Sequence, residues 1–549
     1  MRTPIVLYVL ALVARLMVMA GFTDPAYPDA FYYVNVARQL AAGHGFSTDV
    51  VWIFAEVGGR IPAHPVLPIA SNAHWMPLAS LVQVPFIWVL GPTALASALP
   101  FAILGALSAP LAWLIARDAG SRASVAVGAG VLMAVPALTF SFMVQPDNFS
   151  LYQPLVAGAL LLAGRGMGGS ARSFALAGLL GGVATLSRND GVLVLAVLGA
   201  AFLWDRWRTR RPFGAEPARP ARIPLGAALG AVALFAVAVV PWYARQLAVF
   251  GSLSPSTASG KVLFIRDIGE WNSIDTPATL QHLLGMGIGP LLVTRVGGLV
   301  AALLIFTVLA GAFALIPPMA IGAWRRRRDP AFGPYLGYGV LLFAFSAVVS
   351  AVHVPGGTFI HSAVALVPAG YVLALEGVLA VVAWMAGHRK GWSVERAGRV
   401  FVAATVAFGV LAGAFYAGSV HETWSVKRDR LVAAGAALDA AGVPRDDRVM
   451  SIDASGTRYW TGHPGVVIVN DSLDTIRSVA VAYDIRWLFV ERGESVAAAE
   501  PILIDGVRPA WVGPPILLRP EIGVYPVCTS AGDARCATAV LGRAGAPAP

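Results

Sequence analysis

The sequence predicts an α-helical polytopic membrane protein with about eleven transmembrane helices, followed by a C-terminal α/β domain. The first observation is composition: of 549 residues, 57% are hydrophobic and only 13% are charged, and the mean hydropathy is +0.70. Soluble domains usually contain about 25% charged residues, so a soluble globular enzyme is excluded. The second is a change along the chain. Residues 1–419 carry 27 basic and 15 acidic residues, whereas residues 420–549 carry 13 and 15 and are far less apolar. We therefore expect two domains, divided near residue 420.

Apolar runs predict the membrane helices, because a helix needs about 20 apolar residues to cross the hydrocarbon core. Eleven runs qualify or come close: residues 4–22, 95–116, 124–143, 149–164, 173–188, 191–205, 224–244, 293–321, 332–352, 360–386 and 400–418. Several are short, and only Asn189-Asp190-Gly191 separates the fifth from the sixth. Arg15 lies within the first run, where we expect its side chain to extend outward to the interface or to contact the surroundings of Asp29.

The positions of the basic residues predict how these helices cross the bilayer. If the N-terminus is cytoplasmic, the inside loops together with Arg2 contain 19 of the 27 basic residues of residues 1–419. The positive-inside rule favours this topology. An odd number of spans then places residues 420–549 outside, in a protein of the bacterial plasma membrane. The net charge of +10 therefore reflects membrane orientation, and we expect no nucleic-acid partner.

Residues 420–549 have the pattern of an extracytoplasmic α/β domain. A helix is expected at about 426–441, and strand-like runs follow at 448–452, 466–469 and 487–490, separated by Gly, Pro and Asp. This domain contains both cysteines of the chain, Cys528 and Cys536. Two cysteines so close together indicate a disulfide in an oxidising compartment, with a pair of free thiols as the alternative.

Two of the outside segments are long, and long loops are usually functional. The first loop, residues 23–94, contains helix-length stretches at 28–42 and 75–90 that we expect to lie along the interface. Asp29 comes directly after the first span and is followed by aromatic residues, an environment that can raise the pKa of a carboxyl group towards that of a useful base. Asp147 stands at the outer end of the third span. The alternative for each acid is a helix cap.

The order of these features resembles the GT-C membrane glycosyltransferases, the group that contains protein O-mannosyltransferases and the aminoarabinose transferases of lipid A. The segments that carry the resemblance are Pro28-Asp29 with Tyr32 and Tyr33, residues 37–40 (ARQL), 43–47 (GHGFS), 145–148 (QPDN), 178–188 (GLLGGVATLSR) and 240–245 (VPWYAR) before Phe250-Gly251. The resemblance covers residues 1–260 well and the remaining spans loosely.

The resemblance implies an inverting glycosyltransferase that moves a sugar from a polyprenyl-phosphate donor to a glycan, lipid or protein acceptor outside the membrane. In such enzymes the first-loop acid is the catalytic base, a role that falls on Asp29, with a supporting site role for Asp147. Tyr32 and Tyr33 belong to the substrate-binding part of the same segment. No cofactor is needed, because the glycosyl phosphate is already activated. Asp147 has no acidic neighbour, so a catalytic divalent ion is possible but not supported.

Charge develops on the departing phosphate, and fixed cationic or N–H donors would stabilise it. The candidates at the outer membrane face are Arg188, Arg245, Lys261, Arg266 and His361. An arginine in a span is costly and often functional, although Arg188 could simply pair with Asp190. Arg245 could extend to lipid headgroups, and His361 could be a satisfied helix-end residue.

Three further features leave alternatives open. His44, His64 and His74 lie in the first loop, but their spacing fits no tight zinc motif. Residues 453–463 form a Gly-broken stretch that would suit a carbohydrate or serve as a plain connection. Two other functions remain: a transporter or flippase of lipid-linked sugars, and a non-catalytic membrane protein that binds envelope components. The transferase hypothesis requires the carboxyl groups of residues 29 and 147 to meet in one hollow just beyond the bilayer.

Overall fold

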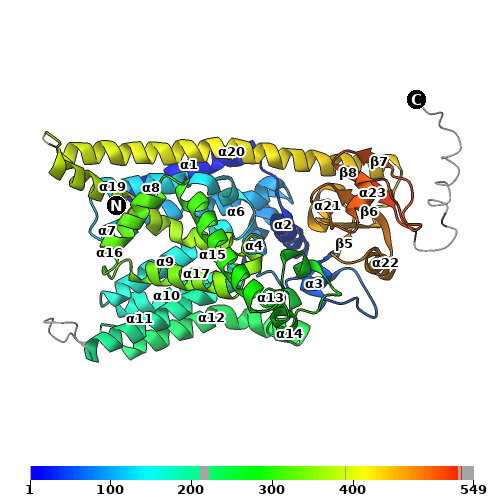
Figure 1. The fold of residues 1–549 in the computed structure, drawn as a ribbon, viewed down its shortest axis with the longest axis horizontal. Helices are drawn as coiled ribbons and strands as arrows, with labels where there is room; N and C mark the ends of the chain where they lie inside the picture. Colours follow the sequence, from blue (N-terminus) through cyan, green and yellow to red (C-terminus); the bar gives the residue numbers. More distant parts are fainter. Residues whose placement is uncertain (1, 211–221, 390, 529–532, 534–549) are drawn as a thin grey trace. The chain divides into compact units, whose positions relative to one another are not determined.

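The computed structural model describes residues 2–210, 222–389, 391–528 and 533 (Figure 1). The chain forms two compact units, each built from three segments. Unit 1 comprises Met1–Asp24, Met76–Arg245 and Leu292–His421, and unit 2 comprises Pro25–Trp75, Gln246–Leu291 and Glu422–Pro549. Residues 25–75 of the first long loop and the second long outside segment, residues 246–291, thus belong to the same unit as the C-terminal segment. The predicted domain boundary near residue 420 stays a prediction.

Unit 1 is helical. Its helices are α1 (Arg2–Gly21), α4 (Leu78–Leu81), α5 (Val84–Leu90), α6 (Ala94–Gly105), α7 (Ser108–Asp118), α8 (Ala123–Ala134), α9 (Phe149–Met167), α10 (Ala171–Ser187), α11 (Val192–Arg210), α12 (Leu225–Phe250), α15 (Ile288–Gly311), α16 (Ile316–Arg326), α17 (Gly333–Val348), α18 (Thr358–Ala363), α19 (Val367–His388) and α20 (Val394–Ala440). Helices α12, α15 and α20 each extend into unit 2. Among the described residues, six helical segments are long and apolar enough to cross a membrane. Each predicted apolar run falls on a helical segment, but the number of spans stays a prediction.

Several predicted elements have other bounds in the structure, and two of these differences change the number of helices. The run at 293–321 is not one helix: α15 ends at Gly311, and Ala312 and Phe313 have positive φ angles of 40° and 61° before α16 begins. Pro317 and Pro318 have no backbone N–H to donate to the preceding turn, so they are accommodated in the first turn of a new helix. Conversely, the predicted span at 400–418 and the predicted helix at 426–441 form one continuous helix, α20.

The helices of unit 1 approach closely at glycines. A Cβ atom added to Gly377 of α19 would lie 1.8 Å from the carbonyl oxygen of Pro318 in α16, and one added to Gly322 of α16 would lie 1.9 Å from that of Leu373 in α19. Small residues let helix backbones approach in this way in membrane proteins. The α16–α19 contact therefore depends on both glycines.

Arg15 does not extend outward, which corrects the expectation from the sequence. Its side chain is 0% exposed and donates to the carbonyl oxygens of Ala134 at 3.1 Å and Met133 at 3.3 Å. These are the last residues of α8, whose terminal carbonyls have no partners within the helix. Arg15 therefore caps the C-terminal end of α8.

Unit 2 is built around a six-stranded sheet with strand order β2-β5-β4-β6-β8-β7. Its strands are β2 (Val50–Val51), β4 (Arg448–Ser451), β5 (Gly465–Val467), β6 (Ile485–Glu491), β7 (Leu517–Arg519) and β8 (Ile522–Pro526). Strands β2, β5, β4 and β6 are parallel, and β8 and β7 continue the sheet antiparallel. The edge strand β2 comes from the first long loop, which the sequence pattern does not indicate.

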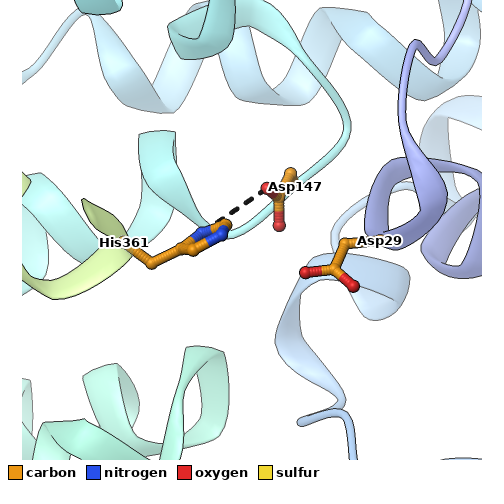
Figure 2. Close-up of side chains that lie close together, drawn as sticks. All are labelled: Asp29, Asp147 and His361. Carbon is orange, nitrogen blue, oxygen red and sulfur yellow. Dashed lines mark ion pairs between the residues drawn. The ribbon is translucent and has the colours of Figure 1, made fainter. Parts of the chain in front are cut away.

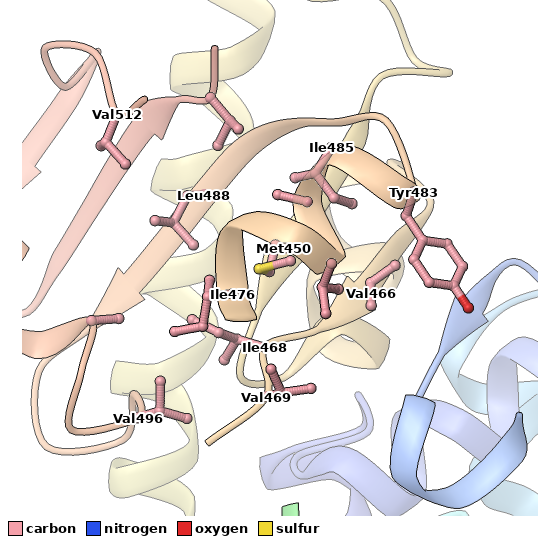
Figure 3. Packing of buried hydrophobic residues seen from close by; sticks show 14 of the residues in the cluster. Met450, Val466, Ile468, Val469, Ile476, Tyr483, Ile485, Leu488, Val496 and Val512 are labelled. Atoms are coloured by element: carbon pink, nitrogen blue, oxygen red, sulfur yellow. The ribbon is translucent and has the colours of Figure 1, made fainter. Parts of the chain in front are cut away.

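The remaining elements of unit 2 are helices α2 (Pro28–Ala41), α3 (Ile53–Glu56), α13 (Thr257–Lys261), α14 (Leu280–Leu284), α21 (Ala454–Thr461), α22 (Leu473–Ala482) and α23 (Glu500–Ile504), and the two-stranded pair β1 (Ser47–Thr48) and β3 (Ile69–Ala70). Figure 3 shows the apolar core, in which Met450, Val466 and Leu488 from the strands cluster with Ile476 of α22. Val51 of the first loop is buried in the same cluster. Cys528 is described, but Cys536 lies outside the described residues, so their disulfide stays a prediction.

Candidate active site

Asp29 lies in the first turn of α2, in unit 2. The N-cap of α2 is Tyr27 and Pro28 is the first helical residue, so Asp29 is not the cap that the alternative interpretation expected. Its Oδ1 atom accepts a hydrogen bond of 2.9 Å from the indole Nε1–H of Trp75. An aspartate in the first turn is also favoured by the helix dipole. The carboxylate is therefore held by a partner from the far end of the same loop.

The two tyrosines that follow Asp29 are buried. Tyr32 is 0% exposed, and its ring stacks on Trp75 with a centroid distance of 4.1 Å. Tyr33 is 1% exposed and meets Tyr32 edge to face at 6.1 Å. Both tyrosines thus form part of an aromatic cluster next to Asp29, and their contact with a substrate stays a prediction.

Asp147 lies in unit 1, between a short 3₁₀ turn and α9, and is 0% exposed. The N-cap of α9 is Asn148, so Asp147 is not the cap either. Figure 2 shows the ion pair between Asp147 Oδ2 and His361 Nδ1, at 3.7 Å. The same His361 nitrogen lies 2.9 Å from Asn148 Oδ1, and the imidazole stacks on Phe149 at 4.1 Å. The structure therefore brings together two predicted site residues, Asp147 and His361, that the sequence did not pair.

Arg188 ends α10 and pairs with Asp190, as the alternative interpretation expected. Its Nη2 atom lies 3.0 Å from Asp190 Oδ2, and the two side chains are 16% and 18% exposed. Asp190 also accepts a hydrogen bond from the hydroxyl of Ser362, the residue after His361. The Arg188–Asp190 pair is thus connected to the same helix, α18, that carries His361.

The other predicted phosphate partners lie on three different segments. Arg245 is inside α12, and its guanidinium group lies over the Trp242 ring at 5.0 Å. Arg266 donates to the carbonyl oxygen of His282. Lys261 ends α13 and donates to the carbonyl oxygen of Ser273. Of the three, Lys261 is the most enclosed.

Lys261 lines a cavity of about 420 Å³ within unit 2. The wall combines glycine backbone, two threonines and apolar side chains: Gly58, Gly59, Thr257, Gly260, Phe264, Ile274, Thr276, Pro277 and Ala278. Lys261 is 8% exposed, and burial lowers the pKa of its ammonium group, an effect that nearby Asp471 and Glu270 partly oppose. A buried cationic donor that lines a cavity is suited to an anionic group.

Glu56 is a buried acid that the sequence analysis missed. It is 5% exposed, and its Oε1 atom accepts a hydrogen bond of 2.6 Å from the Tyr32 hydroxyl. Burial raises the pKa of Glu56 to about 8, although the hydrogen bonds from Tyr32 and from the backbone N–H of Trp52 oppose the shift. The available signal was an acid within the apolar run 53–57, which has to find a partner when buried.

Two of the first-loop histidines have contacts of their own. His74 Nδ1 lies 3.0 Å from Ser256 Oγ and 3.2 Å from Ser259 Oγ. His44 Nδ1 lies 2.7 Å from Gln39 Oε1. Each of these imidazoles is thus hydrogen-bonded through its Nδ1 atom to a hydroxyl or an amide side chain.

Comparison with solved structures shows a fold similar to that of ArnT from Cupriavidus metallidurans, a lipid A aminoarabinose transferase. The apo structure of ArnT matches with a TM-score of 0.56 and 15% identity, and the structure bound to undecaprenyl phosphate with 0.53 and 13%; each match covers 96% of this chain and 98% of ArnT. The Archaeoglobus fulgidus oligosaccharyltransferase matches with a TM-score of 0.45 and 13% identity over 89% of this chain and 69% of that chain, too low to support an argument.

No protein-family model matches the chain, and no curated protein matches it in sequence. The likeness to ArnT therefore rests on the fold. It covers nearly the whole of both chains, including the segments that form unit 2. The chain is an integral membrane protein with a GT-C fold, and the resemblance recognised in the sequence is confirmed at that level.

Proposed function

We propose that this chain, which has the fold of the GT-C glycosyltransferases, is an inverting glycosyltransferase that uses a polyprenyl-phosphate sugar as donor. The observation that carries the proposal is the full-length fold likeness to ArnT, whose structure has been determined with undecaprenyl phosphate bound. The acceptor is a hydroxyl of a glycan, lipid or protein on the outer side of the membrane. The proposal also keeps the predicted topology, with a cytoplasmic N-terminus and an extracytoplasmic C-terminal segment.

In the proposed reaction Asp29 is the general base. A hydroxyl group is a poor nucleophile until a positioned carboxylate accepts its proton, a contribution on the order of 10²–10⁴ in rate. The hydroxyl oxygen bonds to the anomeric carbon from the face opposite the phosphate, and the bond between that carbon and the phosphate oxygen breaks. The bonding electron pair leaves with the phosphate, so that polyprenyl phosphate is released with one more negative charge.

The remaining predicted residues have supporting roles in the proposal. Asp147 and His361, whose side chains lie 3.7 Å apart, present a carboxyl group and an imidazole from unit 1. The developing phosphate charge would be stabilised by Lys261 in its cavity, with Arg188 and Arg245 as further cationic groups. The proposal requires the carboxyl groups of Asp29 and Asp147 to line one space, and this requirement can be tested directly.

The first experiment measures transfer. Purified protein is incubated with radiolabelled polyprenyl-phosphate sugars and envelope fractions, and the label in each fraction is counted. Asp29→Asn should abolish transfer at wild-type expression and membrane insertion, whereas Asp505→Asn, at an exposed position of unit 2, should not change it. Retained transfer in Asp29→Asn would refute the base assignment. Movement of the donor across vesicles without labelling of any acceptor would favour the transporter instead.

The second experiment tests the proximity of the two acids. Cysteines are introduced at positions 29 and 147 in a variant in which Cys528 and Cys536 are replaced by serine. A short bifunctional thiol reagent should link the two positions, giving a single cyclised chain detectable by mass spectrometry after proteolysis. Failure to cross-link, at full reactivity of each single cysteine, would contradict the shared site.

A further inference from the structure

A buried chain of contacts leads from Glu56 to Asp29, entirely within unit 2. This series of contacts begins at Glu56, the last residue of α3, which is 5% exposed. One oxygen accepts the hydroxyl of Tyr32 at 2.6 Å, and the other accepts the backbone N–H of Trp52 at 3.3 Å. Both oxygens of this buried carboxyl group are therefore hydrogen-bonded, as a buried polar group requires.

Tyr32 is fixed from a second direction by Asn72. The backbone N–H of Asn72 donates to the Tyr32 hydroxyl oxygen at 2.8 Å. Asn72 has a φ of 65°, a left-handed conformation that asparagine tolerates better than most residues. Its side-chain amide donates to the carbonyl oxygen of Trp75 at 3.1 Å, and its own carbonyl accepts from Gln246 at 2.7 Å. The Tyr32 hydroxyl is thus held between an acid and a fixed backbone N–H.

Trp75 completes the series of contacts between Glu56 and Asp29. Its indole ring stacks on Tyr32 at 4.1 Å and meets Trp52 edge to face at 5.2 Å. An indole N–H can only donate, and here it donates to Asp29 Oδ1 at 2.9 Å. The position of the indole, which is set by its two aromatic neighbours, therefore determines the direction in which one oxygen of Asp29 is held.

We infer that Glu56 is a positioning residue, which holds the Asp29 carboxylate in its reactive orientation through Tyr32 and Trp75. The inference rests on the proposed function, because it assigns a role relative to the proposed base. Catalytic groups have to be held within about 0.5 Å of their productive geometry by neighbours that are themselves locked. A displacement of about 1 Å can reduce the rate on the order of 10²-fold.

The charge state of Glu56 is consistent with this role. Burial raises its pKa to about 8, which favours the neutral form at neutral pH, and a neutral Glu56 adds no second negative charge near Asp29. A glutamine can make two hydrogen bonds at the same positions, one of them reversed: its amide oxygen accepts the Trp52 N–H, and its amide nitrogen donates to the Tyr32 oxygen, where the carboxyl oxygen accepted the Tyr32 hydroxyl. A leucine of similar size can make neither.

The kinetic test compares four variants in the transfer assay. Glu56→Leu and Tyr32→Phe should each lower kcat on the order of 10- to 100-fold with little change in KM, because the base is misaligned and the substrate contacts remain. Glu56→Gln should stay within about threefold of the wild-type kcat. The double variant Glu56→Leu/Tyr32→Phe should be no slower than the slower single variant, because both changes break one link. Glu395→Leu, at an exposed position, is the control.

Three outcomes would overturn the inference: a wild-type kcat in Glu56→Leu while Asp29→Asn is inactive, an equal loss in Glu56→Gln and Glu56→Leu, or multiplicative losses in the double variant. The first of these leaves the proposed function standing.

A spectroscopic test does not depend on activity. In protein labelled with 5-fluorotryptophan, the ¹⁹F resonance of Trp75 is assigned by its loss in Trp75→Phe. This resonance should shift or broaden in Glu56→Leu and Tyr32→Phe and keep its position in Glu56→Gln and Glu395→Leu. An unchanged Trp75 resonance in Glu56→Leu would show that Glu56 does not hold the indole and would overturn the inference even if the wild-type protein transfers no sugar.

Discussion

Replacing Glu56 by glutamine should make the protein's stability less sensitive to pH. The pKa of Glu56 is raised to about 8 in the folded protein by burial, against an ordinary value of 4.5. Between these values the folded protein keeps a proton that the unfolded chain releases. The free energy of unfolding therefore falls by about 1.4 kcal/mol for each pH unit in this window. The stabilisation is fully present below pH 4.5 and is lost as the pH rises through about 8.

Over the whole window the loss amounts to about 5 kcal/mol, and the glutamine variant does not share it. Because the Glu56 side chain is 5% exposed, solvent screening does not reduce this figure much. For a unit of roughly 200 residues, 1 kcal/mol corresponds to about 2–4 °C in unfolding temperature. The difference in unfolding temperature between Glu56→Gln and the wild type should therefore change by on the order of 10 °C between pH 5 and pH 9. The change should favour the variant.

The assay is thermal unfolding of the detergent-solubilised protein at pH 5, 7 and 9, followed by tryptophan fluorescence, to which Trp52 and Trp75 contribute from the neighbourhood of Glu56. The control is Glu395→Gln, whose side chain is 80% exposed and which should follow the wild type at all three pH values. A gap that stays constant with pH, or a wild type that gains on the variant as the pH rises, would show that Glu56 does not carry a proton in the folded protein.

Three further outcomes follow from particular contacts. Gly377→Ala would place a methyl group 1.8 Å from a backbone oxygen of α16 and should cost about 1–3 kcal/mol or more, seen as a lower unfolding temperature, whereas Gly387→Ala on the same helix meets open space and should be neutral. Equal effects of the two alanines would contradict the close helix contact. Arg15→Met removes the donor to two carbonyl groups at the end of α8 and should destabilise by about 1–3 kcal/mol; an unchanged unfolding temperature would show that water replaces it. Lys261→Met should raise KM for the lipid-linked donor about tenfold with a smaller change in kcat, and an unchanged KM would remove Lys261 from the donor site.

The helices of unit 1 could be predicted well from the sequence because apolar runs depend only on local composition. Their ends could not be predicted as well. Hydropathy marks where a chain leaves the hydrocarbon core, not where a helix stops, and residues 419–425 contain no proline or glycine to end α20. A helix of 47 residues is about 70 Å long, more than twice the thickness of the core. The break at residues 312–313 could have been predicted from Pro317 and Pro318, because prolines are accommodated in the first turn of a new helix.

The site was predictable in part, for a different reason. Asp29 and Asp147 stand out because an acid at the end of an apolar run is locally unusual. The pairing of Asp147 with His361 joins residues more than 200 positions apart, and no local pattern encodes it. Glu56 was missed because a single acid in an apolar stretch of five residues is a weak signal of burial as long as its partner, Tyr32, is not known.

The structure of unit 2 also bears on the C-terminal segment. Helix α2, which carries Asp29, packs on α21 of that segment: Asn35 donates to the carbonyl oxygen of Ser455 at 3.0 Å, and the Phe31 and Tyr459 rings meet at 5.4 Å. Strand β2 of the same loop pairs with β5. The first loop contributes only a two-residue strand to this sheet, and its residues Val51 and Ile53 are buried in the apolar core of the C-terminal segment. That segment therefore forms part of the scaffold that orders Asp29, and any role in acceptor binding comes in addition to this structural one.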